Sequence, residues 1–181
     1  YTLLRDAVLV RDAQFNGQDS IEYDGAMAKV KSLQNVGKAF VTGIDLHAKV
    51  HVSHNVTAAT QLSAAQGRDT ESEMPLRPVP PLFGQTSVIY EAKQWTGELY
   101  ARYNAWKQLD DIPVAGGEVT VYTDDGVPSW WTLNLRGDVR IVEHLELVAS
   151  LENILDLHYR PYGSGVSAPG RNLIVSLRAE L

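Results

Sequence analysis

Three closely spaced histidines, His47, His51 and His54, are the side chains of this sequence best suited to metal binding. His47 and His51 fall on one face of a predicted strand, where four residues separate them by roughly 13 Å. Two ligands of one zinc ion must each place a nitrogen about 2 Å from that ion. We therefore predict no metal site here and interpret the histidines as part of a polar surface.

A glycine-rich stretch, GSGVSA at residues 163–168, formally matches the dinucleotide-binding pattern GxGxxA. That pattern binds a cofactor only where a strand precedes it and a helix follows it. Here Arg160-Pro161 precede it and Pro169-Gly170 follow it, so we predict a loop and no cofactor. The sequence also places no serine beside a histidine and an acid, and we predict no catalytic residue and no enzyme.

The charge pattern excludes several partners. A net charge of −6 without an offsetting basic stripe argues against nucleic acid. The chain of 181 residues has no cysteine, which excludes disulfides and thiolate metal sites. Acids in the long connections could coordinate calcium or simply be solvated, and we favour solvation. These acids are Glu71, Glu73, Asp110, Asp111, Asp124 and Asp125.

The segments that position these side chains have the alternating pattern that predicts β-strands. In the final stretch, RNLIVSLRAEL at 171–181, Leu173, Val175 and Leu177 share one face opposite mostly polar residues. Such a face points to a core in a soluble domain, or to lipid in an outer-membrane barrel with a polar lumen. No run of about 18 apolar residues predicts a membrane helix, but a spanning strand needs only about 9–11 residues.

The predicted strands come in pairs with very short turns, and long connections separate the pairs. Short turns are predicted at Ser53–Asn55, near Gln94-Trp95 and at Val142–His144, and long connections at roughly Asn16–Gly37, Arg68–Gly84, Lys107–Ser129 and Asp156–Gly170. This alternation of lengths is typical of outer-membrane barrels, whereas long structureless loops are uncommon in compact soluble domains. Counting Tyr1–Phe15 as the first strand gives about eight strands in an all-β, antiparallel, up-and-down barrel.

One segment is ambiguous. In GAMAKVKSLQNV, residues Gly25–Val36, the side chains of Met27, Val30 and Leu33 recur at helical spacing. The segment is either a helical turn in a loop or the extended upper part of a long strand. We favour the strand.

Several motifs resemble those of TonB-dependent outer-membrane receptors. ENILDLHYR at 152–160 is similar to the ENIFD-x-x-Y-R stretch of that family, and PGRN at 169–172 to the P-G-R-N that precedes its final strand. WWTLNLR at 130–136 looks like its W-x-x-L-N-L-R strand. NVGKA at 35–39 with the downstream GID resembles N-x-G-x-A-x-x-x-G-x-E, with Asp45 where Glu is commoner. The chain departs from the family by ending on Leu181 and not on Phe.

The resemblance covers essentially the whole chain and implies a 22-stranded barrel. An N-terminal plug fills such a barrel, which imports scarce ligands such as siderophore-iron, haem, cobalamin or glycans. We expect residues 1–181 to be its C-terminal segment, a fragment without the plug and the TonB box, in the outer membrane of a Gram-negative bacterium. Expected partners are outer-membrane lipid, the plug and remaining strands, the TonB complex through the missing N-terminal region, and a small-molecule or metal-chelate ligand.

Two sets of residues follow as candidate sites. Inward charges on the last three strands are expected to face the lumen, form cross-strand pairs and contact the plug. They are Arg136, Asp138, Arg140, Glu146, Glu152, Arg178 and Glu180. Residues on or beside the long loops are expected to contact the ligand, and these are Tyr122, Tyr159, Arg160 and Tyr162.

The alternative is a free-standing eight-stranded outer-membrane barrel with a structural or adhesion role, since eight strands can close on themselves. Against it, the inward charges would have to pack inside a narrow barrel. A soluble ligand-binding β-barrel ranks third, because the asymmetry of loop lengths argues against it.

Overall fold

The computed structural model describes residues 1–6, 8–35, 37–70, 73–76, 79–112, 123 and 125–179. Within them the chain forms strands and one turn of 3-10 helix, η1 (Leu109–Asp111). None of the described helical residues belongs to a helix able to cross a membrane. The chain has two compact units: the loop unit (Tyr1–Gly43, Ala65–Pro80 and Trp106–Pro128) and the wall unit (Ile44–Ala64, Pro81–Ala105 and Ser129–Leu181).

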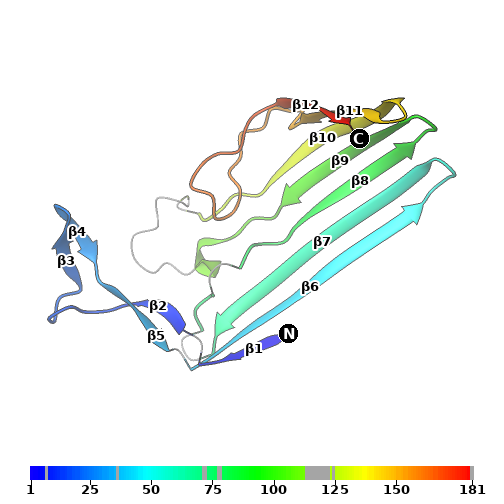
Figure 1. The fold of residues 1–181 in the computed structure, drawn as a ribbon. Helices are drawn as coiled ribbons and strands as arrows, with labels where there is room; N and C mark the ends of the chain where they lie inside the picture. The colour runs from blue at the N-terminus through cyan, green and yellow to red at the C-terminus, as the bar shows by residue number, and fades with distance from the viewer. Residues whose placement is uncertain are drawn as a thin grey trace. The chain divides into compact units, whose positions relative to one another are not determined.

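One antiparallel sheet runs in the order β1-β6-β7-β8-β9-β10-β11-β12, so from β6 onward each strand pairs with the next one in the sequence (Figure 1). Its strands are β1 (Thr2–Arg5), β6 (Lys38–His51), β7 (Val56–Asp69), β8 (Phe83–Glu91), β9 (Trp95–Asn104), β10 (Trp130–Val142), β11 (Leu145–Glu152) and β12 (Asn172–Ala179). The all-β, antiparallel, up-and-down prediction is therefore confirmed.

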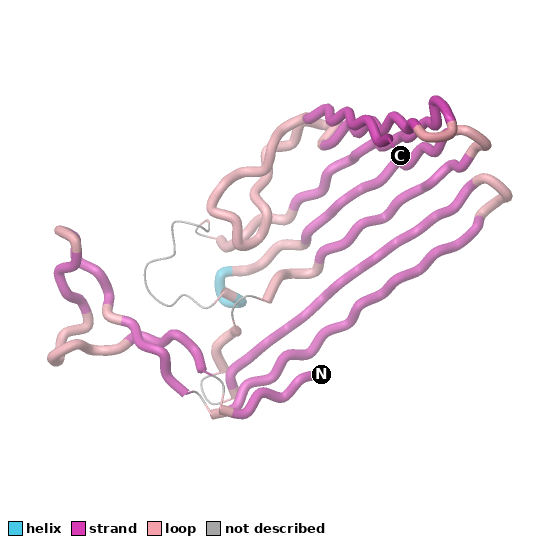
Figure 2. The backbone as a smooth tube through the Cα atoms, in the orientation of Figure 1, coloured by secondary structure: helices cyan, strands magenta, loops and turns pink. Residues whose placement is uncertain are grey.

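The tight turns of the wall unit lie together at one end of its strands (Figures 1 and 2). At the turn after β6, the backbone N–H groups of Val52 and Ser53 both donate to the carbonyl of Val56, at 2.8 and 3.1 Å. Asn55 links this turn to the next hairpin, because its side-chain Nδ2 donates to the Glu91 carbonyl at 2.7 Å. The short turns fall where the sequence predicts them.

Burial in the wall unit is the reverse of that in a soluble protein. On β10, Thr132 and Asn134 are only 2% and 3% exposed, whereas Trp131 and Leu135 are 50% and 47% exposed. On β12 nearly every residue is exposed, and the apolar Leu173, Val175 and Leu177 are among the most exposed, at 66%, 61% and 64%. Because side chains of a strand alternate between faces, the sheet has an exposed apolar face and an opposite polar face.

Two glycines on the apolar face are covered by aromatic rings. A Cβ added to Gly84 would lie 2.5 Å from the Gln61 carbonyl oxygen and 2.9 Å from the ring of Tyr103. A Cβ on Gly97 would lie 3.1 Å from the ring of Trp95. The Tyr103 ring thus lies over Gly84 of the neighbouring strand, where a Cβ would clash, and the Trp95 ring lies over Gly97 of its own strand, where a Cβ would be tight.

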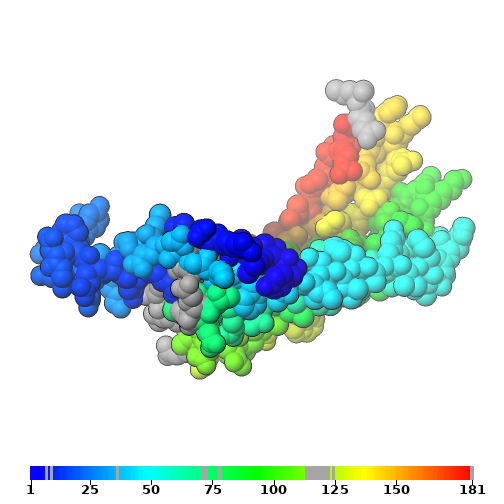
Figure 3. Space-filling view, turned by 90° about the horizontal axis from the view of Figure 1, so that it is seen from below, coloured from blue at the N-terminus to red at the C-terminus, as the bar shows by residue number. Residues whose placement is uncertain are grey.

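The predicted long connection Asn16–Gly37 is instead mostly strand, which corrects the sequence interpretation. β2 (Val8–Asp12) pairs with β5 (Lys31–Asn35), and β3 (Ser20–Tyr23) pairs with β4 (Ala26–Lys29). We call these four strands the ribbon. The β3–β4 pair lies at the end of the ribbon that is farther from β1 (Figure 3). Two-residue turns organise it: Asn16-Gly17 and Asp24-Gly25 both have positive φ at both positions. These are the dihedral signs of a type I′ hairpin turn, which Asn-Gly and Asp-Gly favour.

The first predicted strand, Tyr1–Phe15, is also divided. β1 joins β6 in the large sheet, whereas β2 joins β5 in the ribbon. Asp6 and Gly37 mark the break on the two strands, with φ of 55° and 70°. The strand preference for Gly25–Val36 is confirmed for its described residues, since β4 and β5 occupy most of the segment.

The loop unit has a small apolar core. Ala39, Leu76 and Val79 are buried together, with Val41 and Ala65 packed against them. Beside this core the Arg11 guanidinium forms an ion pair with the buried carboxylate of Asp69. This apolar core holds the β7–β8 connection against β6 and β7.

The sheet does not close on itself in the part of the chain that the structure describes. There β12 pairs only with β11, and β1 only with β6. A free-standing eight-stranded barrel would need both strands to have a second neighbour, so the structure does not support that alternative.

Candidate functional site

The polar face of the wall unit carries charges in cross-strand rows. Arg136 on β10 lies opposite Glu98 on β9 and Ser150 on β11. Nearer the tight turns, Arg140 lies opposite Glu146, which in turn lies opposite Arg178 on β12. The register therefore places opposite charges next to each other along the wall.

Two of these pairs make contact. Arg178 Nη1 lies 2.8 Å from Glu146 Oε2, and Arg136 Nη1 lies 4.0 Å from Glu98 Oε2. The Arg136 guanidinium also lies over the ring of Tyr100, 5.5 Å from its centroid. Exposed ion pairs contribute only about 0–1 kcal/mol each, so these contacts orient the side chains more than they stabilise the sheet.

The remaining charges of this predicted set are placed as follows. Asp138 lies opposite Thr96 and Val148, and Glu152 lies opposite Asn172. Arg140, Glu146 and Arg178 line an open cavity of about 260 Å³ near the β10–β11 turn. Glu180 lies outside the described residues.

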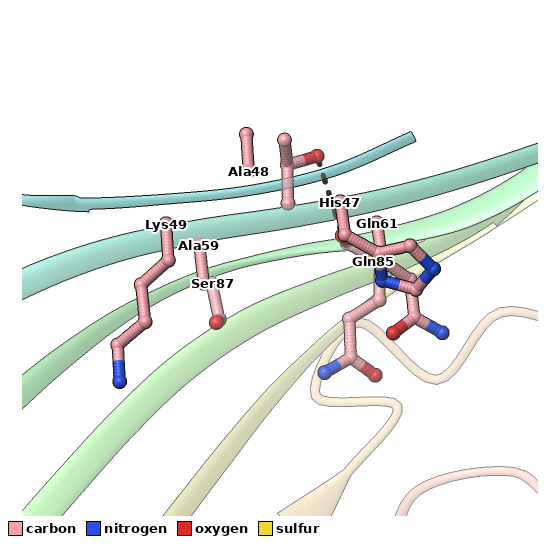
Figure 4. A pocket seen from close by; sticks show the side chains of 8 residues that line it. His47, Ala48, Lys49, Ala59, Gln61, Gln85 and Ser87 are labelled. Carbon is pink, nitrogen blue, oxygen red and sulfur yellow. Dashed lines mark hydrogen bonds between the residues drawn. The ribbon is translucent and has the colours of Figure 1, made fainter. Parts of the chain in front are cut away.

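A second depression lies on the polar face between β6, β7 and β8, with a volume of about 260 Å³. Figure 4 shows His47, Gln61 and Gln85 reaching the same space from three strands, with Lys49 and Ser87 beside them. We call it the donor pocket and define it by these five residues. The sequence analysis singled out only His47 in it, because Gln and Lys on a strand carry no signal of their own.

Metal binding finds no support in the described residues, which contain no group of three His, Cys, Asp or Glu side chains able to hold an ion. His51 Nδ1 instead lies 3.0 Å from the hydroxyl oxygen of Thr57. Of the acids considered for calcium, Glu71 and Asp124 lie outside the described residues.

The β11–β12 connection begins with a corner built around Asn153, which is 3% exposed and has φ of 48°. Its side chain binds both backbone polar groups of Leu157: Nδ2 donates to the carbonyl at 2.8 Å, and Oδ1 accepts from the N–H at 3.0 Å. Its own backbone N–H donates to Oδ1 of the buried Asn134 at 2.9 Å. Asparagine suits this place because it tolerates positive φ and carries both a donor and an acceptor.

Asp156 closes the other side of the corner. Its Oδ1 accepts from the backbone N–H of Arg171 at 2.7 Å, and a Cβ on Gly170 would lie 2.6 Å from the same oxygen. Arg171 Nε donates to the Ile154 carbonyl at 3.0 Å. The motifs ENILD and PGR, although far apart in the sequence, thus meet and set where β12 begins beside β11.

The predicted ligand contacts lie past this corner. Tyr159 packs its ring on Trp130 with centroids 4.3 Å apart, so part of its surface is already occupied. Arg160 and Tyr162 follow on the same connection, Arg160 exposed and Tyr162 half-buried. Tyr122 lies outside the described residues.

The loop unit holds a small ionic cluster. Arg68 Nη2 lies 3.6 Å from Asp111 Oδ1. Burial lowers the pKa of Lys107 below its ordinary value, with Arg68 adding to that effect and Asp111 opposing it. The backbone of Lys107 pairs with Val127 across this loop at 3.0 and 2.8 Å. The charges therefore join the end of β7 to the β9–β10 connection.

The fold and the two faces define the class of protein. An antiparallel meander with tight turns at one end, an exposed apolar face and an opposite polar face is the wall of an up-and-down transmembrane β-barrel. A family model described as "TonB dependent receptor-like, beta-barrel" matches residues 6–154. The chain belongs to this family, whose members are transport receptors and not enzymes.

Solved structures with the same fold agree. The copper transporter OprC superposes with a TM-score of 0.79 at 20% identity, over 98% of this chain and 27% of that chain. A mutant ferric enterobactin receptor (PfeA) of Pseudomonas aeruginosa, in complex with enterobactin, has a TM-score of 0.71 at 18% identity, over 98% and 28%. The ferripyoverdine receptor of the outer membrane of Pseudomonas aeruginosa has a TM-score of 0.55 at 18% identity, over 78% and 20%.

The chain thus spans about a quarter of the length of the first of these structures, 27%. A comparison with curated protein sequences gave no match. At these identities the superpositions show the fold alone.

Proposed function

We propose that residues 1–181 are the C-terminal wall segment of a TonB-dependent receptor in the outer membrane of a Gram-negative bacterium. The whole receptor imports a scarce small molecule or metal chelate with energy from the TonB complex. The segment itself performs no chemistry. It completes the barrel wall, carries recognition loops and encloses the plug.

The observation that carries the proposal is the inverted burial of the wall unit. Exposed apolar patches on soluble monomers rarely exceed a few hundred Å². Here exposed apolar side chains recur along the wall strands, such as Leu46 on β6 and Leu177 on β12. Lipid is the solvent that favours such a face, and a closed ring of strands is the only β-structure that satisfies every backbone polar group within it. Further strands of the receptor would supply neighbours for β1 and β12.

The polar face then lines the lumen. Arg136, Asp138, Arg140, Glu146, Glu152, Arg178 and Glu180 are the charges assigned to it. On β10 the alternation supports this assignment. Arg136 is one residue after the exposed Leu135 and three residues before the apolar Val139, so it lies on the face opposite to both. Within the lumen these charges hold neighbouring strands in register and face the plug.

The loops carry the proposed ligand contacts. The residues proposed to contact the ligand lie on or beside the long connections and not at the tight turns. They are Tyr122, Tyr159, Arg160 and Tyr162. Aromatic rings and a guanidinium suit anionic or aromatic metal chelates. Copper and ferric enterobactin are named for two of the structurally similar receptors, and metal or metal-chelate cargo is the class we infer here.

Uptake by intact cells tests this function. Cells with and without the gene that contains this segment are given labelled ferric siderophores, copper, haem, cobalamin and oligosaccharides in turn. We expect one class of probe to lose uptake on deletion, and the same uptake to stop when a protonophore removes the energy source. Recovery of the polypeptide in the soluble fraction, or no difference for any probe, would contradict the proposal.

A further inference from the structure

The donor pocket collects hydrogen-bond donors from three strands. His47 and Lys49 come from β6, Gln61 from β7, and Gln85 and Ser87 from β8. Figure 4 shows their side chains on the same side of the sheet, with the His47 ring close to the carboxamides of Gln61 and Gln85. An imidazole, an ammonium, two carboxamides and a hydroxyl all present N–H or O–H groups to one open space.

No residue that lines this pocket carries a carboxylate. In the described part of the chain, the side chains of His47, Lys49 and Gln61 make no hydrogen bond or ion pair with another residue of the chain. The hydrogen-bond donors of these three side chains are therefore available to bind a ligand. This differs from the row at Arg178, whose guanidinium is already paired with Glu146.

A second cation borders the pocket. Arg102 on β9 lies directly opposite Gln85 on β8, so both side chains are on the same face. Arg102 is exposed. The nearest acid along β6, Asp45, accepts a hydrogen bond from the hydroxyl of Ser63 at 2.6 Å and keeps its negative charge. Lys49 and Arg102 outnumber this one acid, so the surface around the pocket has a net positive charge and is rich in donors.

We propose that the donor pocket is a carboxylate-binding site on the inner wall of the barrel. Lys49 and Arg102 supply the charge, and Gln61, Gln85 and Ser87 supply neutral donors. The inference rests on the proposed function, because it requires the polar face to line an aqueous lumen. The carboxylate comes either from an anionic solute that passes through the lumen or from an acidic side chain of the polypeptide that fills it.

The charge of the pocket can be measured with a cysteine at Ala59, which lines it without contributing a donor and lies opposite Ser87. In the intact receptor, Ala59→Cys is treated with an anionic and a cationic methanethiosulfonate reagent of similar size. We expect the anionic reagent to react about tenfold faster, the ratio expected when one positive charge acts at short range on reagents of opposite sign in a largely aqueous site. Adding Lys49→Gln should bring the ratio close to one.

A matched control lies on the same face. Thr96 on β9 is opposite Glu91 and Asp138, two acids. Thr96→Cys should react with both reagents and favour the cationic one. If the cysteine at position 96 reacts with neither reagent but with an apolar maleimide in lipid, the proposed function fails. If it behaves as expected while Ala59→Cys shows no preference for the anion, only the present inference fails.

Two further arms identify the source of the carboxylate. If succinate slows the reaction of Ala59→Cys and neutral succinamide does not, the site takes free anions. If the cysteine is protected from both reagents and a water-soluble carbodiimide joins Lys49 to an acidic residue of the same polypeptide, the carboxylate belongs to the receptor. Either result supports the site. Equal rates with both reagents, no effect of succinate and no link at Lys49 would overturn it.

Discussion

Replacement of Asn153 by alanine should destabilise the barrel segment more than any exposed substitution in the same connection. The substitution removes two side-chain hydrogen bonds to Leu157, at 2.8 and 3.0 Å, which contribute about 0.5–1.5 kcal/mol each. It also places alanine at φ of 48°, where a left-handed backbone costs about 1–2 kcal/mol. Together these losses lower the free energy of unfolding by about 3 kcal/mol.

Guanidinium unfolding of the intact receptor in lipid vesicles, followed by tryptophan fluorescence, measures this change. Asn153→Gly separates the two contributions, because glycine keeps the backbone conformation without strain and should recover about 1 kcal/mol relative to alanine. Val166→Ala, at a position 72% exposed in the same connection, should change stability by less than about 0.5 kcal/mol. If Asn153→Ala behaves like Val166→Ala, the corner does not position β12 and the reasoning is refuted.

Three further predictions concern the apolar face and the loop cluster. Leu135→Arg should lower stability in lipid by up to about 2–4 kcal/mol if the position is near the bilayer centre, and an unchanged unfolding midpoint would count against a lipid-facing role. Gly84→Ala should destabilise by about 1–3 kcal/mol through overpacking, whereas Gly137→Ala, whose added Cβ would lie 3.4 Å from its nearest neighbour, should cost less in the same assay. Asp111→Asn should lower the pKa of Lys107 further, since Asp111 opposes the effect of burial; an NMR titration of methylated lysines that shows a rise would contradict this.

The sign of the pH effect at Lys107 follows from that shift. Its pKa is lower in the folded protein than in the unfolded chain, so the folded state binds this proton less tightly. The contribution of Lys107 to stability therefore rises as pH increases through the folded pKa toward the unfolded value. The charged form, dominant at lower pH, is the one that burial disfavours.

The strands of the wall could be predicted because alternation is a local property of the sequence. The stretch from Trp130 to Val142 alternates so regularly that its faces can be assigned without coordinates. The turns near Asn55 and His144 follow from the short gaps between such runs. What alternation alone does not reveal is whether a core covers the apolar face, and the exposure of Leu135 and Leu173 shows that the described part of the chain does not cover it there.

Most of the ribbon, β3 to β5, occupies a segment in which the alternation of apolar residues predicts a long connection. Its turn signals were present in the sequence, since Asn16-Gly17 and Asp24-Gly25 are the dipeptides that favour type I′ hairpins. β3, between the two turns, and β4, after the second turn, have only 4 residues each, too few to show a period. Turn chemistry, and not periodicity, was the informative signal there.

The candidate sites depended on long-range register, which a single sequence does not encode visibly. The pairing of Glu146 with Arg178 spans 32 residues, and the donor pocket joins three strands. The corner motif is visible in the sequence as a family resemblance, whereas its physical role follows from the contact between Asp156 and Arg171. Residues that act on their own strand are predictable in this way, whereas residues that act across strands are not.

The central claim is that the wall unit has one face in lipid and one in water. Nitroxide labels placed one at a time from Trp131 to Ile141 on β10 of the intact receptor, in outer-membrane lipid, test it by their accessibility to oxygen and to a polar nickel complex. The account predicts a period of two residues, with oxygen favoured at Leu135 and Val139 and nickel favoured at Arg136 and Arg140. Uniform accessibility to nickel along the strand, or the opposite phase, would contradict it.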